Sequence, residues 1–276
     1  MAWDRAAAPA WSGAGSWSDA GAWDRAAAAV ASGVSSDDGD KHVATTATDW
    51  GDWDGVGGNQ YWAAAGWFAV LDIAAGEEVM PILDSTDQSS VDPVGFTFGF
   101  KDTGGGGTGE RLLITMTKAS GSKRVTSSVD WQPPDTDWHH FAIKGSNKAG
   151  GNELWVDGVK LATLTDATSQ RTGATNRALT CGAAAGVWTG RGTKVGHFAV
   201  WDPQSGFGEL STGDAAALYN GGVVALPSTL HATAPTIEFG AMTPPAAGAD
   251  VEDADLPSGW EVAGSGNAVV WADIVP

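Results

Sequence analysis

The sequence has one cysteine, few basic residues and no long apolar run. Cys181 has no second cysteine to pair with, so the fold does not depend on an internal disulfide. No apolar stretch approaches the roughly 18 residues that a membrane-spanning helix requires, so we expect no membrane insertion. Lysine and arginine total 15 against 33 acidic residues, a formal net charge of −18. A surface of this charge repels phosphate backbones, so we expect no nucleic-acid partner.

The first residues also lack the features of a secretory signal. The segment Met1–Arg5 carries neither a basic stretch nor the start of an apolar one. Together with the lone cysteine, this predicts a protein that folds in a reducing cytoplasm.

What is present indicates a large core joined by many turns. Hydrophobic residues make up 42% of the 276 residues, which disfavours wholesale disorder. The 39 glycines suit turns rather than helices. Tryptophan, with 15 residues, outnumbers phenylalanine and tyrosine together, which indicates large anchors in a core or at interfaces.

Residues 1–40 differ in composition from the rest of the chain. The segment Trp3–Ala8 is repeated as Trp23–Ala28, and glycines interrupt the alanine-rich stretches. Several exposed tryptophans are unfavourable in water, so we expect an arm that packs on a neighbouring subunit or on its own β domain. The expected assembly contacts are Trp3, Trp11, Trp17 and Trp23.

The middle of the chain is rich in strand patterns. Val94–Phe100 alternates apolar residues with glycine or threonine, which predicts a strand with one buried face. Asp157-Gly158 separates Glu153–Val156 from Val159–Leu164, and this pair favours the tight turn of a β-hairpin. Many short strands at such spacing predict an all-β sandwich.

One short helix is expected near 211–219. Ser211 and Asp214 have the spacing of a capping box, and Asn220–Gly222 favours a left-handed end. The remainder, 223–276, reads as a tail with short strands that pack on the sandwich or on a neighbour.

Two motifs carry a family resemblance. Trp138–Ile143 followed by Glu153–Val159 resembles the core of laminin-G-like domains, which belong to the concanavalin A-like lectin/glucanase superfamily. Val195–Trp201 followed by Leu218–Gly222 is similar to the closing motif of that family. The resemblance implies a jelly-roll sandwich of two antiparallel sheets. The resemblance covers roughly residues 60–222, and we assign the jelly-roll domain to residues 41–222.

The sequence lacks the catalytic motif of the glucanases in this superfamily. Glucanases of the superfamily resemble one another in a Glu-x-Asp-x-x-Glu strand, and none of the eight glutamates begins that motif. No phosphate-binding loop or dinucleotide fingerprint is present. We therefore expect a non-enzyme, with a glucanase-like hydrolase as the third-ranked alternative.

Two sets of residues are candidates for ligand binding. Laminin-G-like domains that bind calcium do so at the sandwich rim, so calcium is the one cofactor that the resemblance suggests. Aspartates in so acidic a chain more often serve as solubilising charge. The calcium candidates are Asp52, Asp54, Asp84 and Asp87. The aromatic residues that could stack on a sugar, or equally pack in a core, are Trp50, Trp53, Tyr61 and Trp62.

These observations favour a structural subunit of a virion, most simply a bacteriophage capsid decoration, head-fibre or tail-associated protein. The fold that the resemblance implies is typical of extracellular recognition modules. Secreted proteins usually have a signal peptide and disulfides, and we expect neither here. A phage protein made in the host cytoplasm and released by lysis reconciles the two. Expected partners are copies of itself, other virion proteins and a host-surface glycan. The alternative is a carbohydrate-binding, lectin-like module.

Overall fold

The computed structural model describes most of the chain after residue 31. The expected arm contacts Trp3, Trp11, Trp17 and Trp23, and the calcium candidates Asp54 and Asp87, lie outside the described residues. The described residues are 32–36, 41–53, 61–70, 80–85, 94–102, 110–117, 124–129, 131, 133, 135–146, 151–164, 174–175, 177–181, 193–240, 247, 250–264 and 269–274.

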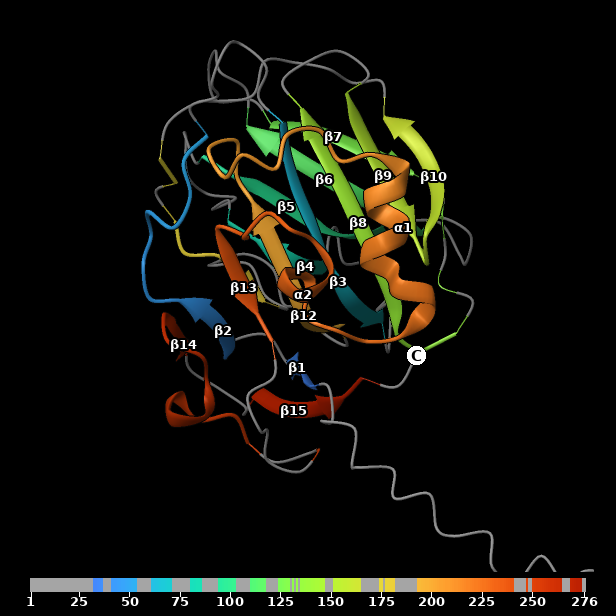
Figure 1. Ribbon diagram of the computed structural model, residues 1–276. Coiled ribbons are helices and arrows are strands. Elements are labelled where there is room, and N and C mark those ends of the chain that lie inside the picture. The colour runs from blue at the N-terminus through green and yellow to red at the C-terminus, as the bar shows by residue number, and fades with distance from the viewer. Residues whose placement is uncertain are drawn as a thin grey trace, which may run out of the picture.

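The fold contains two antiparallel sheets (Figure 1). The first has eight strands in the order β10-β9-β8-β3-β12-β1-β15, with β13 also paired to β12. Its strands are β1 (Ser32–Ser36), β3 (Tyr61–Val70), β8 (His139–Ser146), β9 (Asn152–Val156), β10 (Val159–Leu164), β12 (Thr193–Trp201), β13 (Ile237–Phe239) and β15 (Val269–Asp273).

The second sheet has seven strands in the order β14-β2-β11-β4-β5-β6-β7. They are β2 (His42–Thr45), β4 (Met80–Asp84), β5 (Phe96–Asp102), β6 (Glu110–Thr117), β7 (Arg124–Val129), β11 (Thr180–Cys181) and β14 (Trp260–Ala263). The predicted all-β, two-sheet antiparallel sandwich is therefore confirmed.

The core between the sheets follows the alternation of the sequence. In β5, Phe96, Phe98 and Phe100 are fully buried, as the two-residue period of a strand predicts. The rings of Phe98 and Phe141 lie 4.7 Å apart and join the two sheets. Burial of each such ring contributes about 1.5–3 kcal/mol to the stability of the fold.

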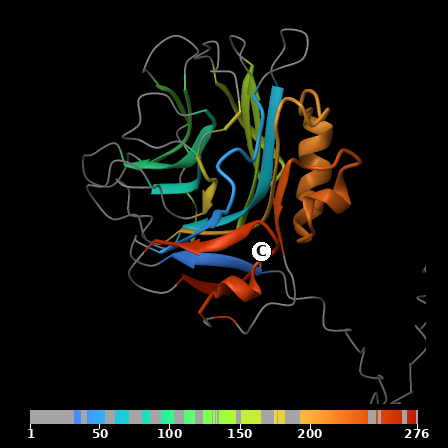
Figure 2. The ribbon, with the colours of Figure 1, turned by 90° about the vertical axis from the view of Figure 1, so that its left-hand side faces the viewer.

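Helices cover the outer face of the eight-stranded sheet. Figure 2 shows α1 (Thr212–Tyr219) and the short α2 (Pro227–Leu230) on one side of the sandwich, with β4 and β5 on the other. Beneath α1 lies a second apolar cluster that includes Trp155 and Trp201, both fully buried. Ser211 caps α1 in a capping box with Asp214, which confirms the predicted helix. Two 3₁₀ turns, η2 (Asn220–Gly222) and η3 (Asp253–Asp255), complete the described helical elements.

The predicted hairpin is also present. Strands β9 and β10 pair directly, and Asp157 and Gly158 between them have φ angles of 49° and 73°. Both are the left-handed conformations that this turn requires.

The ends of the sandwich differ from the expected division of the chain. Strand β1 falls within the arm expected at 1–40, yet it pairs with both β12 and β15. The sandwich therefore includes residue 32. Strands β13, β14 and β15 of the expected tail are members of the two sheets rather than additions to a finished domain. Within the described part of the chain, no helix is long and apolar enough to cross a membrane.

Candidate functional site

Of the four aromatic residues that could stack on a sugar or equally pack in a core, three are buried. Trp53 and Trp62 have no exposed surface, and Trp50 is 9% exposed. Trp62 stacks on Phe96 with ring centroids 4.5 Å apart. A sugar can stack only on an exposed ring face, so the binding interpretation is wrong for Trp53 and Trp62, and core packing is their role. Tyr61 is half-buried at the start of β3.

The described calcium candidates contact other parts of the protein. The backbone N–H of Asp52 donates to the Asp202 carboxylate at 2.7 Å, and Asp84 accepts a hydrogen bond from the Thr97 hydroxyl. Among the described residues, no group of three histidine, cysteine, aspartate or glutamate side chains could hold a metal ion. Because Asp54 and Asp87 lie outside the described residues, calcium binding stays a prediction.

Among the described residues, two hollows are candidate sites. One, of about 220 Å³, is acidic, but its Asp253 carboxylate is engaged with the local backbone, since it accepts the N–H of Val262 at 2.7 Å. This hollow is lined by Lys41, Asp250, Val251, Glu252, Asp253, Val262, Gly264 and Val269.

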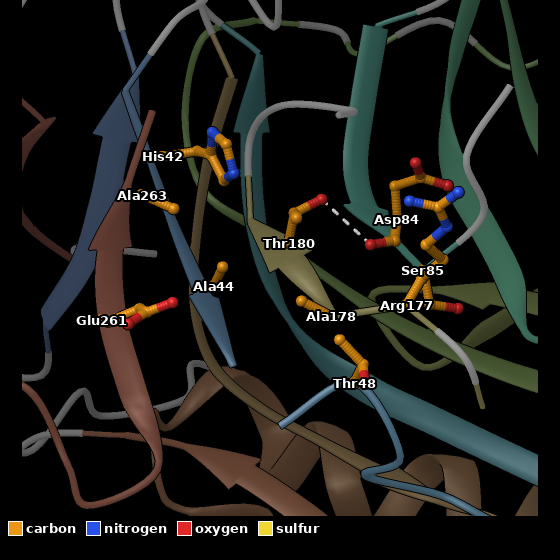
Figure 3. A pocket seen from close by; sticks show the side chains of 10 residues that line it. All are labelled: His42, Ala44, Thr48, Asp84, Ser85, Arg177, Ala178, Thr180, Glu261 and Ala263. Atoms are coloured by element: carbon orange, nitrogen blue, oxygen red, sulfur yellow. Dashed lines mark hydrogen bonds between the residues drawn. The ribbon is translucent and has the colours of Figure 1, made fainter. Parts of the chain in front are cut away.

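The other hollow lies on the outer face of the seven-stranded sheet (Figure 3), and we call it the sheet pocket. Its volume is about 210 Å³. The residues that follow its lining residues in the strands, such as Val43, Cys181 and Val262, pack on the core, which places the pocket on the opposite face. It is lined by His42, Ala44, Thr48, Asp84, Ser85, Arg177, Ala178, Thr180, Glu261 and Ala263.

The strand register fixes the order of side chains across the sheet pocket. Glu261 of β14 pairs with Ala44 of β2, Ala44 with Thr180 of β11, and Thr180 with Asp84 of β4. Asp84 in turn pairs with Thr97 of β5. One row therefore crosses five strands, with a carboxylate at each end of the pocket.

The walls of the sheet pocket differ in chemistry. Figure 3 shows Glu261 and His42 on one side, Asp84 and Arg177 on the other, and Thr180 between them. The floor is made of small side chains, Ala44 and Ala178. Hydrogen-bonding groups thus surround a shallow apolar base, which is the usual composition of a small-ligand site.

Hydrogen bonds to the backbone hold the Asp84 wall in place. The Thr180 hydroxyl donates to the carbonyl of Asp84 at 2.9 Å. The Ser85 hydroxyl donates to the carbonyl of Phe96 at 3.2 Å and accepts its N–H at 3.0 Å. These bonds tie β11, β4 and β5 together, so the wall is positioned before any ligand arrives.

Of the residues that line this pocket, only Asp84 was a candidate from the sequence, and it was a candidate calcium ligand. The lining residues come from positions between 42 and 263, and no spacing in the sequence brings them together. Strand pairing alone does so. The one usable signal is that Ala44, Thr180 and Glu261 each alternate with a core residue in a short strand.

The adjacent residues His139 and His140 face opposite sides of β8, as expected of strand neighbours. His139 contacts Trp131 and Phe68, whereas His140 contacts Trp67 and Tyr219. The side-chain hydrogen bond to Asp157 raises the pKa of His139, and burial lowers the pKa of His140 to about 4. The two histidines therefore pack within the fold, and neither lines the sheet pocket.

No family model matches the sequence, and no curated protein matches it. Solved structures are similar in fold at low identity. A heptameric SAP-like pentraxin from Limulus polyphemus is 11% identical, with a TM-score of 0.47 over 69% of this chain and 82% of that one. Domain 4 of AbnA, a GH43 extracellular arabinanase from Geobacillus stearothermophilus solved with arabinotriose, is 18% identical, with a TM-score of 0.39 over 59% and 68%.

The binding domain of botulinum neurotoxin DC, solved with rat synaptotagmin II, is 12% identical, with a TM-score of 0.42 over 58% of this chain and 35% of that one. All three similarities are too distant to assign a ligand. The two antiparallel sheets agree with the jelly-roll sandwich that the sequence resemblance implies.

Proposed function

We propose that this protein is a non-catalytic carbohydrate-binding module and that the sheet pocket is its binding site. The observation that supports this most is the row across the pocket, in which Glu261 and Asp84 stand on either side of the small residues Ala44 and Thr180. A sugar ring presents hydroxyls around its edge and C–H groups on its faces. Polar walls around a small apolar floor match that distribution.

The spacing of the two carboxylates argues against glycoside hydrolysis. Glu261 and Asp84 are separated by three strand-to-strand steps, and each step is about 4.8 Å, so their backbones lie about 14 Å apart. Side chains in a sheet stand roughly perpendicular to it, which keeps the carboxylates far apart as well. Hydrolysis requires a separation of about 5–10 Å. Binding without turnover is the function that this geometry favours.

A glycan array of neutral and acidic bacterial and eukaryotic glycans tests the proposal, with calorimetry on the glycan bound most strongly. We expect Ala178→Leu, which fills the floor, and Glu261→Gln, which removes an exposed carboxylate, each to weaken binding at least about tenfold. Ala217→Leu, the same change on the exposed face of α1, should bind as the wild type does. Absence of binding to every glycan, or equal binding by all variants, would contradict the proposal.

A second proposal, the virion subunit, is supported by β1. This strand follows the tryptophan-rich segment directly and lies between β12 and β15. A force applied to the segment before Ser32 would therefore act on β1, a strand that is paired on both sides and is not at the edge of its sheet. The protein would assemble with copies of itself or with other virion proteins through that segment, and the sheet pocket would recognise a host-surface glycan.

Deletion of residues 2–31 tests this role. We expect the shortened protein to unfold at the same temperature as the full chain but to lose self-association in native mass spectrometry and attachment to purified virions in electron microscopy. A full chain that is a monodisperse monomer and absent from virions would overturn the assignment. The carbohydrate proposal does not depend on this outcome.

A further inference from the structure

The sheet pocket is open at one end of its row and closed at the other. Glu261 is exposed, whereas Ala44, Thr180 and Asp84 are 2%, 4% and 2% exposed. The next residue in the row, Thr97, is fully buried. Exposure therefore ends between β14 and β2, and the row does not continue as an open groove over β5.

The side walls show where the pocket opens. Near Glu261, Ala263 and His42 are half-buried. Beside the floor, Thr48 is exposed and Arg177 and Ala178 are half-buried (Figure 3). On the closed side, Ser85 is 1% exposed, and its hydroxyl is bonded to the backbone of Phe96. A ligand can enter and leave past Glu261 and Thr48, but a chain cannot run through the pocket and out over β4 and β5, where Asp84, Ser85 and Thr97 are buried.

The volume sets the size of what enters. At about 210 Å³, the pocket is smaller than the roughly 300–1,000 Å³ of sites for drug-sized molecules. This space suits one sugar ring rather than several. The opening at Glu261 leaves room for the remainder of a glycan outside.

Charge restricts the sugar class. Asp84 and Arg177 line the same wall, so a carboxylate and a guanidinium offset each other there. The chain as a whole carries a net charge of −18, which repels polyanionic glycans.

We propose that the sheet pocket binds the terminal ring of a neutral glycan chain, with the rest of the chain leaving past Glu261. This inference rests on the carbohydrate-binding function proposed above and specifies how the glycan is held. It distinguishes a pocket that binds the terminal ring of a glycan from a groove that binds several internal rings. Either the reducing or the non-reducing terminus satisfies the geometry, and the experiment separates them.

The experiment uses the full chain and the array glycan bound most strongly, in free form, at lengths of one, two, four and six units. End recognition predicts dissociation constants within about threefold of one another, since only one ring is enclosed. A groove predicts an affinity that rises at least about tenfold from one unit to six, because each added ring makes new contacts.

Two blocked hexasaccharides identify the end. One has its reducing-end ring opened by borohydride, and the other carries a methyl ether on its non-reducing ring. We expect one of them to lose at least about tenfold in affinity and the other to bind normally. Affinity that increases with length, or full binding by both blocked forms, would overturn this inference and leave the carbohydrate function intact. No binding at any length would overturn both.

Discussion

The Thr180 hydroxyl donates a hydrogen bond to the backbone carbonyl of Asp84 at 2.9 Å, across the floor of the sheet pocket. Thr180 is 4% exposed and Asp84 is 2% exposed, so water cannot easily replace this bond. The bond joins β11, which has only two residues, to β4 and so stabilises the part of the sheet that forms the pocket.

Thr180→Val should therefore reduce the free energy of unfolding by about 1–3 kcal/mol, because it leaves a buried carbonyl without this donor. Urea unfolding followed by tryptophan fluorescence measures the loss. Thr229→Val is the matched control: its hydroxyl donates to the Leu226 carbonyl at 2.7 Å, but the residue is exposed. Equal losses in the two variants would contradict the role of burial.

Gly145 lies directly under the edge of the Trp62 indole. A Cβ at position 145 would lie 1.8 Å from Nε1 of that ring, and Trp62 is fully buried and cannot move aside. We expect Gly145→Ala to cost about 3 kcal/mol or more, as overpacking of a filled core does. Thermal unfolding by circular dichroism checks this.

Gly213→Ala serves as the control for that substitution. Its Cβ would meet nothing closer than the Ser211 hydroxyl at 3.5 Å, and alanine favours the α1 helix over glycine. This variant should be as stable as the wild type or more stable. If Gly145→Ala behaves in the same way, the packing of Trp62 on β8 is wrong.

The local structure of the sandwich could be predicted because each feature depends on neighbouring residues. The Phe96–Phe100 alternation, the Asp157-Gly158 turn and the Ser211–Asp214 capping box each lie within a few positions, and all three are present. Strand β1 was missed because Ser32–Ser36 is short and polar and is held by its two neighbours rather than by its own pattern.

The site could not be predicted in the same way. A tryptophan suits both a buried core and an exposed sugar-stacking surface. The residue type alone therefore does not decide whether Trp53 and Trp62 are buried. Glu261 and Asp84 are brought into one row by three strand pairings, and the sequence fixes no register between strands so distant.

The buried His140 should make the fold sensitive to acid. Burial lowers its pKa to about 4 from 6.5, although the nearby Asp157 carboxylate acts in the opposite direction. The unfolded chain therefore binds a proton first as the pH falls below 6.5, and stability is lost progressively down to about pH 4. The loss is about 3 kcal/mol. Burial also lowers the pKa of His197, with the same sign.

Urea unfolding of the wild type and of His140→Phe between pH 7.5 and 4 measures this effect. The variant keeps an aromatic ring beside Trp67 and Tyr219 but has no proton to bind. We expect the free energy of unfolding of the variant to fall less steeply with decreasing pH than that of the wild type, by the slope that corresponds to the uptake of about one proton. Superimposable pH profiles would contradict the assignment.

His139 should act with the opposite sign. Its side-chain hydrogen bond to Asp157 raises its pKa, and Asp135 adds to the effect, while burial opposes it. Its contribution to stability is therefore complete below pH 6.5 and is lost as the pH rises through the folded-state pKa. His139→Gln should lose more stability at pH 5.5 than at pH 8. A larger loss at pH 8 would contradict this direction.

The cap of α1 fixes the start of the helix that packs on the apolar cluster around Trp155. The Ser211 hydroxyl accepts the N–H of Asp214 at 3.2 Å, and the Asp214 carboxylate accepts the N–H of Ser211 at 2.9 Å. Ser211→Ala should cost about 1 kcal/mol, whereas Ser211→Asn, which retains a capping oxygen, should cost little. Hydrogen exchange of the α1 backbone amides should speed up in the alanine variant alone. Equal exchange in both variants would mean that α1 does not depend on this cap to stay on the sheet.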